Sequence, residues 1–375
     1  MIDNASFDSN KKPQFKLIWK KLHLDLTLIM LIMLLAVFGI IILYSACDQS
    51  KSVITHQLAH FLFAFGCLLI VAQIHPHRLM QLAPWFYAFS LTLLLLVPII
   101  GHSSQGAKRW IGTHSFQIQP SEFMKLAMPM MTAWILDRER LPPNNSTILT
   151  CMITIAIPAL LIAKQPDLGT AIIIGMSGIF VIILAGINWK TVAIALVAFI
   201  ASCPILWHFL HTYQKQRILT LLDPSRDPLG SGYNIIQSKI AVGSGGVSGK
   251  GWLHGTQAHL AFLPTHTTDF IFAVNAEEFG LIGATLLIII LFLIFLRSVM
   301  ISMDAPTSFS RLLCGSLSCT FVMSGIINIG MVIGVLPVVG IPLPLVSYGG
   351  SYLVTIFIGF GILMSAKTHK KLWSS

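Results

Sequence analysis

Residues 262–280 read FLPTHTTDFIFAVNAEEFG and join a polar, glycine-rich stretch to a strongly apolar one. Asp269 directly precedes the apolar residues, and Glu277 and Glu278 follow inside the apolar run. Carboxylates at such depth are costly to bury and usually mark a site that handles substrate or protons. The stretch therefore predicts a membrane helix with a functional acid at its mouth.

The chain has 375 residues, of which 55% are hydrophobic and 10% are charged. This composition is typical of a polytopic membrane protein. We expect an all-α protein with about ten transmembrane helices, because that many apolar runs are long enough to cross a bilayer. The runs lie at 26–46, 58–74, 82–100, 120–136, 148–163, 168–185, 190–210, 270–296, 312–336 and 346–365.

An even number of spans places both termini on one side of the membrane. Both tails are rich in lysine, and short loops on the cytoplasmic side carry an excess of Lys and Arg, so we expect cytoplasmic termini. The net charge of +10 then needs no nucleic-acid partner, because basic tails face anionic membrane lipids. The predicted parts are an N-terminal tail (1–20), a transmembrane domain (21–366) with one large extracytoplasmic loop (211–269), and a C-terminal tail (367–375).

The large loop contains turn signals, a short apolar segment and a glycine run. IIQSKIAVG (235–243) suits a short helix along the membrane surface, and GSGGVSGKGW (243–252) follows with Lys250 inside it. Glycine lets the backbone approach a ligand closely and present its N–H groups, but it also makes ordinary flexible loops. The run matches neither the P-loop nor the dinucleotide fingerprint, because no buried strand precedes it.

Asp269 has two readings. At a helix N-terminus, a carboxylate caps free N–H groups and interacts favourably with the helix dipole. At the membrane boundary, it is also well placed to act as a general base between a polar acceptor and a lipid-anchored donor. Adjacent helix positions differ by about 100°, so Glu277 and Glu278 cannot share one face. We expect at least one of them to face the bundle interior, paired with a cation or a backbone group.

Further polar residues stand just before or at the start of predicted helices. Glu122 and Lys125 are three residues apart, which places them on one helix face and predicts an intramembrane ion pair. The functional alternative is that the pair holds a cavity-lining helix or that Lys125 contacts a phosphate. Arg109 stands beside Trp110 and either reaches lipid phosphate or grips a pyrophosphate. Asp167 is either a helix cap or a second acid of the site.

Residues 328–351 form an apolar segment broken by several glycines and prolines. Irregular backbone at membrane depth needs protein or a water-filled cavity around it, so this segment predicts an outer re-entrant turn. It also keeps a transporter reading open. His254, His259 and His266 lack metal-ligand spacing, and the six cysteines lack CxxC spacing. We therefore expect neither a metal site nor a structural disulfide.

With these residues in view, the chain resembles the SEDS family of bacterial cell-wall polymerases, over about residues 20–365. The long loop block favours the family's elongation branch, the RodA-like proteins, over its division branch. The matching blocks are RWIGTHSFQIQPSEFMKLA (109–127), KQPDLGTA (164–171), QRILTLLDPSRDPLGSGYNIIQSKIAVGSGGVSGKGWLHGTQ (216–257), LPTHTTDFIFAVNAEEFG (263–280) and GVLPVVGIPLPLVSYGGS (334–351).

The resemblance implies a multi-pass inner-membrane peptidoglycan glycosyltransferase that polymerises lipid II on the outer face during cell elongation. It implies as partners a class B penicillin-binding transpeptidase and other membrane proteins of the elongation complex. The family's catalytic aspartate falls on Asp269, and its other important polar positions fall on Glu122, Lys125 and Asp167. The family usually has a glutamate and a histidine where this chain has Thr265 and Thr267, so those two roles cannot be carried over.

The expected mechanism has Asp269 as the general base. Cations stabilise the leaving pyrophosphate, and the candidates are Arg109, Arg217, Lys239 and Lys250. No nucleotide cofactor is required because the donor is already activated, and a divalent cation on the pyrophosphate stays open. The alternatives are a lipid II flippase or transporter, which buried ionisable residues and broken helices fit, and a non-catalytic scaffold for a transpeptidase.

Overall fold

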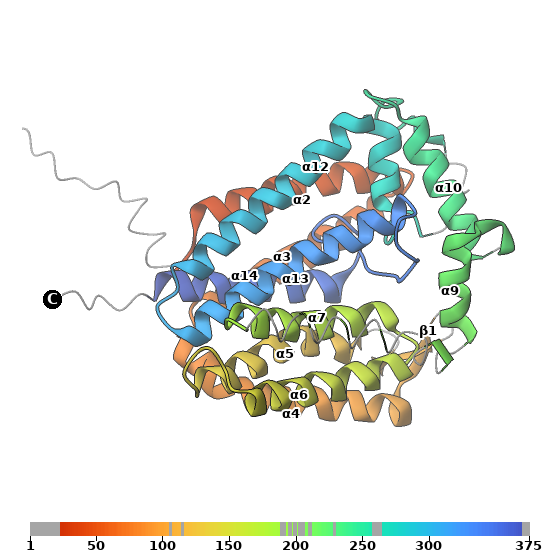
Figure 1. Cartoon of the computed structure of the whole chain (residues 1–375). Coiled ribbons are helices and arrows are strands. Elements are labelled where there is room, and N and C mark those ends of the chain that lie inside the picture. The colour runs from red at the N-terminus through yellow and green to blue at the C-terminus, as the bar shows by residue number, and fades with distance from the viewer. Residues whose placement is uncertain are drawn as a thin grey trace, which may run out of the picture.

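The computed structural model of the chain is a bundle of long helices (Figure 1). It describes residues 23–104, 107–113, 116–187, 193, 197, 201, 207–208, 212–227, 230–256 and 265–369. Its elements are α2 (Leu26–Ala46), α3 (Lys51–Ala72), α4 (Pro76–Ile100), β1 (His102–Ser104), β2 (Ala107–Thr113), β3 (Phe116–Ile118), α5 (Pro120–Asp137), α6 (Asn145–Lys164), α7 (Leu168–Leu184), α9 (Thr212–Leu222), η1 (Pro224–Arg226), α10 (Ser231–Ser244), α12 (Ile271–Met303), α13 (Ser308–Val332) and α14 (Gly350–Thr368).

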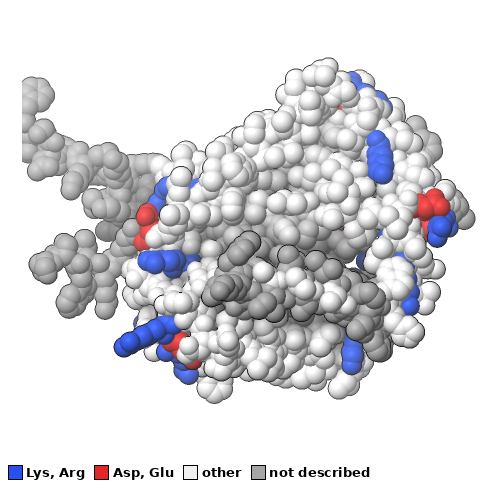
Figure 2. All heavy atoms as spheres, in the orientation of Figure 1, with Lys and Arg blue, Asp and Glu red and all other residues white. Residues whose placement is uncertain are grey.

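The bundle has two chemically distinct ends. At one, the tail end, α14 finishes; at the other, the loop end, lie α9, α10 and β1 (Figure 1). On the face shown in Figure 2, the charged side chains lie near these two ends and the surface between them is uncharged. This distribution suits a bundle whose middle faces lipid and whose ends face water.

Among the described residues, seven helices are long and apolar enough to cross a membrane: α2, α3, α4, α6, α12, α13 and α14. The apolar helix α7 is shorter, and α5 carries charged residues along its length. The predicted span 190–210 lies almost entirely outside the described residues. Each of the other predicted spans overlaps one of these helices, so the multi-pass helical architecture is confirmed.

Arg297 lies inside α12, because that helix continues well past the end of the predicted span. The predicted span 270–296 stopped one residue before Arg297, so its end was placed too early. Its guanidinium Nη2 is 2.8 Å from Oδ2 of Asp25, the N-cap of α2. Lys367 near the end of α14 also pairs with Asp25. The carboxylate thus ties three helices together at the tail end.

A small antiparallel sheet at the loop end corrects the all-helical prediction. Its strand order is β1-β2-β3, with His102 opposite Trp110 and Ile111 opposite Ile118. The sheet occupies the connection between α4 and α5. It places Arg109, on β2, at the loop end of the bundle.

The second correction concerns α12, which is not one continuous helix. Gly280 has φ 62° and ψ −155°, so the helix breaks just after Glu277 and Glu278. The glycine run packs against the break. Lys250 N–H donates to the Glu277 carbonyl and Gly251 N–H to the Glu278 carbonyl, both at 3.0 Å. These bonds satisfy backbone groups that a broken helix would leave unpaired.

The contact between the glycine run and α12 explains why glycine is needed in this run, because the two backbones approach each other closely. A Cβ added to Gly249 would lie 2.0 Å from the Glu278 carbonyl oxygen, and its φ is +79°. Gly243, in α10, has open space around the same position. Glycine is therefore required at Gly249 and not at Gly243.

We expect Gly249→Ala to destabilise the protein by about 2 kcal/mol or more, since it adds a clash to a strained backbone conformation. Gly243→Ala should be neutral or slightly stabilising, because alanine suits a helix interior better than glycine. Thermal unfolding in detergent measures both. Equal unfolding temperatures for the two variants would contradict the packing described.

Candidate active site

The turn that carries Asp269 is held by the irregular connection between α13 and α14. Ser347 Oγ donates to the Thr268 carbonyl at 2.5 Å, and Tyr348 N–H donates to the Thr267 carbonyl at 3.0 Å. Asn328, fully buried in α13, donates from Nδ2 to the carbonyl of Asp269 at 2.8 Å. These bonds fix the backbone of the acid on a neighbouring part of the bundle.

The capping reading of Asp269 finds no support in the geometry. The N-cap of α12 is Phe270, and no side chain caps that helix end. The side chain of Asp269 is instead half-buried at the mouth of the helix. An acid in this position is available for chemistry.

Burial and the positive charge of Arg217 act in opposite directions on the pKa of Asp269. Burial raises the pKa of its carboxyl to about 6, Arg217 opposes this shift, and the negative charge of Asp167 adds to it. Burial is the larger of the two effects. A carboxylate with a pKa near neutrality is well matched to general base catalysis.

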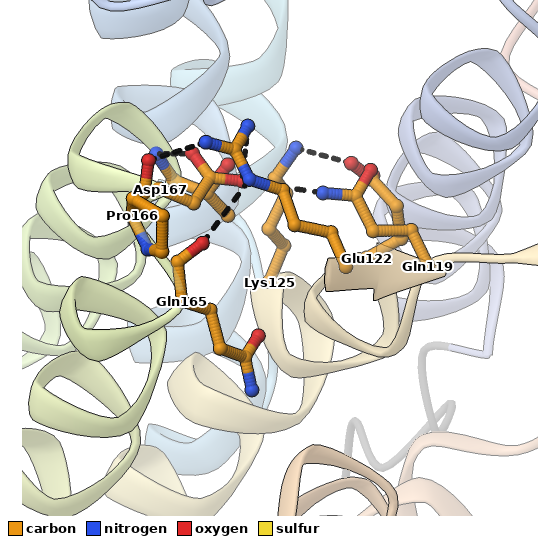
Figure 3. Close-up of polar contacts among 8 residues, drawn as sticks. Gln119, Glu122, Lys125, Gln165, Pro166 and Asp167 are labelled. Carbon is orange, nitrogen blue, oxygen red and sulfur yellow. Dashed lines mark hydrogen bonds and ion pairs between the residues drawn. The ribbon is translucent and has the colours of Figure 1, made fainter. Parts of the chain in front are cut away.

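Asp167 is both a helix cap and a member of a polar cluster. Its Oδ1 accepts a bond of 3.2 Å from Thr170 N–H at the start of α7. Its Oδ2 lies 3.6 Å from Nη1 of Arg109 and 3.3 Å from Nε2 of Gln119. Figure 3 shows Gln119 and Asp167 turned toward each other. The two readings of Asp167 are therefore compatible.

Arg109 is held by the turn that precedes α7. Its Nε donates to the Gln165 carbonyl at 3.2 Å, and its Nη2 donates to the Pro166 carbonyl. The side chain is 28% exposed. Arg109 therefore links the sheet to the start of α7, and its positive charge is paired with the carboxylate of Asp167.

The broken segment between α13 and α14 packs against both the start of α7 and the Asp269 side chain. A Cβ on Gly340 would lie 3.7 Å from Oδ2 of Asp269. A Cβ on Gly169, at the start of α7, would lie 2.5 Å from the Val339 carbonyl oxygen. Irregular backbone is thus packed against protein, which it needs at membrane depth.

The spacing of Glu122 and Lys125 does produce an ion pair. Lys125 Nζ is 2.6 Å from Glu122 Oε1, and both side chains are 9% exposed. The ammonium also lies 4.6 Å from the ring centroid of Tyr352. Figure 3 places this pair close to Gln119 and Asp167. Lys125 additionally lines a cavity of about 60 Å³ between α5, α13 and α14.

Lys250 forms an ion pair at the break of α12. Its Nζ is 2.6 Å from Glu277 Oε1, and Thr256 donates to the same oxygen from its backbone N–H at 2.9 Å. Glu278 accepts a bond from Ser45 Oγ of α2. The two glutamates therefore face different partners, as their 100° separation requires.

The two remaining predicted cations lie in the loop. Arg217, on α9, is half-buried and acts electrostatically on Asp269. Lys239, on α10, is exposed and lies against the broken segment: a Cβ on Gly334 would be 2.0 Å from Lys239 Cε. The structure thus gathers Asp269, Asp167, Arg217 and Arg109 at the loop end, with Lys250 on the helix break.

Sequence reasoning missed Asn328, Ser347 and Gln119. An uncharged polar residue inside an apolar helix was the available signal for Asn328, but its partner stands 59 residues away in the chain. Within the described residues, no group of three or more His, Cys, Asp and Glu side chains is arranged to hold a metal. His259 lies outside the described residues.

Comparisons with known sequences agree over nearly the whole chain. A family model described as "Cell cycle protein" (FTSW_RODA_SPOVE) matches residues 24–372. The peptidoglycan glycosyltransferase MrdB of Escherichia coli K12 is 45% identical, over 96% of this chain and 98% of the relative. The probable peptidoglycan glycosyltransferase FtsW of Trichlorobacter lovleyi is 34% identical, over 93% of this chain and 94% of the relative.

Solved structures agree with the fold. A chain from the structure described as "Structural coordination of polymerization and crosslinking by a peptidoglycan synthase complex" has a TM-score of 0.79 and 30% identity, over 91% of this chain and 96% of that chain. The crystal structure of the rod shape determining protein RodA from Thermus thermophilus has a TM-score of 0.69 over 91% of this chain and 95% of its own, at 24% identity, and shares the fold. The chain therefore belongs to the family of cell cycle proteins that includes FtsW, RodA and SpoVE.

Proposed function

We propose that this protein is a peptidoglycan glycosyltransferase that polymerises lipid II into glycan strands during cell elongation. The observation that carries the proposal is Asp269, a half-buried carboxyl with its pKa raised to about 6, facing Arg217 and Asp167 at the loop end of the bundle. Relatives of similar length are named peptidoglycan glycosyltransferases, and the site offers the acid and the cations that such a reaction needs.

In this mechanism, Asp269 takes the proton from the GlcNAc 4-hydroxyl of an incoming lipid II. The resulting oxygen nucleophile attacks the anomeric carbon of the reducing-end MurNAc on the growing chain, and the polyprenyl pyrophosphate leaves with the bonding electrons. Attack opposite the leaving group inverts the anomeric centre and forms a β-linkage. A well-placed general base contributes roughly 10²–10⁴ in rate.

The leaving pyrophosphate develops negative charge, and cations aimed at it stabilise the transition state. Arg217 is the first candidate because it already acts on Asp269. Arg109 is the second, at the same end of the bundle through its contact with Asp167. Lys239 and Lys250 remain candidates, although Lys250 would have to leave Glu277 to contact the substrate.

The proposed setting is the bacterial inner membrane, crossed by ten spans, with both termini cytoplasmic and the loop 211–269 on the outer face. The loop end then meets the outer headgroup layer, where the lipid tails of donor and acceptor can stay in the bilayer. A class B penicillin-binding transpeptidase is the proposed partner, since a structural neighbour belongs to a peptidoglycan synthase complex. Other membrane proteins of the elongation complex complete the assembly.

The pH dependence of polymerisation should report Asp269. Only the deprotonated carboxylate accepts a proton, so the initial rate should rise as pH increases through about 6, the raised pKa of this group, and then level off. Initial rates with purified protein and lipid II between about pH 5 and pH 8 provide the measurement. A rate that does not change across this range would remove Asp269 as the titrating base.

Purified protein supplied with lipid II in detergent or vesicles separates the proposal from its two rivals. Glycan chains resolved by gel electrophoresis support the enzyme. Movement of labelled lipid II between leaflets without chain growth would favour the flippase or transporter, for which the broken α12 and the irregular 333–349 segment are the supporting observations. Neither movement nor chains, with a transpeptidase still recruited, would favour the scaffold.

A further inference from the structure

A cavity of about 920 Å³ lies at the tail end of the bundle, away from the candidate active site. It forms where α3 and α14 end and α4 and α13 begin. The helix α4 leads from this cavity to the sheet at the loop end, so a full helix length separates the two sites (Figure 1). Its polar lining includes Gln73, His75, His77, Arg78, Thr307 and His369.

The lining carries the guanidinium of Arg78 and three imidazoles. Arg78 and His77 are exposed in the first turn of α4, and His75 is its N-cap. His369 is fixed in place, because its ring stacks on His23 at 4.1 Å and meets His75 edge-on at 5.1 Å. Imidazole and guanidinium N–H groups are good donors to phosphate oxygens.

The backbone around the cavity favours an anion as well. The N-termini of α4 and α13 both lie at the cavity, and helix N-termini carry partial positive charge, which at α13 is already matched by a carboxylate. The one carboxylate in the lining, Asp137, accepts a hydrogen bond of 2.8 Å from Phe309 N–H in the first turn of α13. Its charge is therefore directed at that helix end.

An exposed apolar stripe continues from Arg78 along α4. Leu82, Trp85 and Phe89 follow Arg78 at spacings of four, seven and eleven residues, which places all four on one helix face. The three apolar side chains are 51%, 75% and 53% exposed. A ligand with a phosphate at Arg78 and acyl chains along this stripe matches the surface in both charge and polarity.

We propose that this cavity binds the phosphate headgroup of an anionic phospholipid, with Arg78 as the main contact and the acyl chains along Leu82, Trp85 and Phe89. The histidines His75, His77 and His369 surround the headgroup. The site lies at the headgroup layer of the leaflet opposite the candidate active site, and it does not depend on the proposed polymerase activity.

The test is native mass spectrometry of the purified full chain in a neutral detergent. The probes are dioleoyl phosphatidylglycerol and dioleoyl phosphatidylcholine, which share acyl chains and differ in net charge. We expect preferential retention of phosphatidylglycerol, and about a fivefold loss of its affinity in Arg78→Gln, the effect of one basic residue at an anionic surface. Arg311→Gln is the control, because Arg311 is also exposed in the first turn of a tail-end helix but does not line the cavity.

Three results would overturn the proposal. Equal retention of the two lipids would show that the headgroup charge is not recognised. Equal losses in Arg78→Gln and Arg311→Gln would show general attraction to a basic surface. Displacement of phosphatidylglycerol by inorganic phosphate at similar concentration would assign the cavity to a free anion.

Discussion

Asp269→Asn should reduce glycan synthesis from lipid II by roughly 10²–10⁴, the usual contribution of a positioned general base. Asparagine preserves the size of the side chain and cannot accept the proton at neutral pH. The backbone bonds that hold the turn come from the carbonyls of Thr267, Thr268 and Asp269, so the substitution leaves them in place. Chain length and yield on a gel, at equal protein concentration, measure the effect.

The same variant should be no less stable than the parent protein. Because burial raises the pKa of Asp269 to about 6, the folded state disfavours its charged form at neutral pH. That destabilising contribution declines as pH falls below about 6 and vanishes only below 3.8, the ordinary pKa of the group, and asparagine removes it at every pH. A lost activity with an unchanged or raised unfolding temperature therefore assigns the defect to chemistry.

Asp223→Asn is a suitable control for this comparison. Asp223 stands in the same loop, with a side chain 45% exposed and paired with Arg226 at 3.1 Å. Its substitution should leave glycan synthesis unchanged. Full activity in Asp269→Asn would remove this residue from the mechanism, and a loss in Asp223→Asn of the same size would point to the loop as a whole.

The helices of this protein are readable from its sequence because the membrane demands long apolar runs. The predicted spans at 26–46 and 168–185 fall on α2 and α7 within a residue at either end. The prediction was less accurate for α12, which continues to Met303. From sequence alone, Arg297 suggests the end of the span, because its ion-pair partner cannot be seen. That partner, Asp25, is 272 positions away in the chain.

Features built from distant backbone contacts were not predictable. The glycine run could serve a ligand or a flexible loop, and the structure shows it bonded to the break of α12 at Gly280. The sheet at β1–β3 arises from short strands whose pairing has no strong apolar alternation. In both cases, the deciding partners are backbone groups, which every residue carries and which leave little trace in sequence.

The candidate site was predictable in its acids and less so in its supports. Asp269 and Asp167 were identified from their positions before apolar helices, and the ion pair of Glu122 and Lys125 followed from helix geometry. Asn328 was missed, although it bonds both the Asp269 carbonyl at 2.8 Å and the Ile341 carbonyl at 2.7 Å. Local spacing reveals pairs on one helix, while the groups that position the turn of the candidate base come from elsewhere in the fold.

Lys125→Met should destabilise the protein by about 3–5 kcal/mol, because it leaves the carboxylate of Glu122 buried without a counter-charge. The buried Glu122 Oε2 already has no hydrogen-bond partner within the described part of the chain. Glu122→Gln should cost less, since the ammonium of Lys125 keeps its contact with the ring of Tyr352. Thermal and denaturant unfolding measure how much stability each of the two variants loses.

The double variant Glu122→Gln/Lys125→Met separates stability from function. Removing both charges should restore most of the stability lost in Lys125→Met, because a neutral buried pair has no charge to desolvate. Arg226→Gln, at the exposed pair with Asp223, should produce no measurable change. If the double variant is stable and still polymerises lipid II, the pair only holds α5. If it is stable and inactive, the charged pair serves the reaction. Losses that simply add in the double variant would show that the two charges are not coupled.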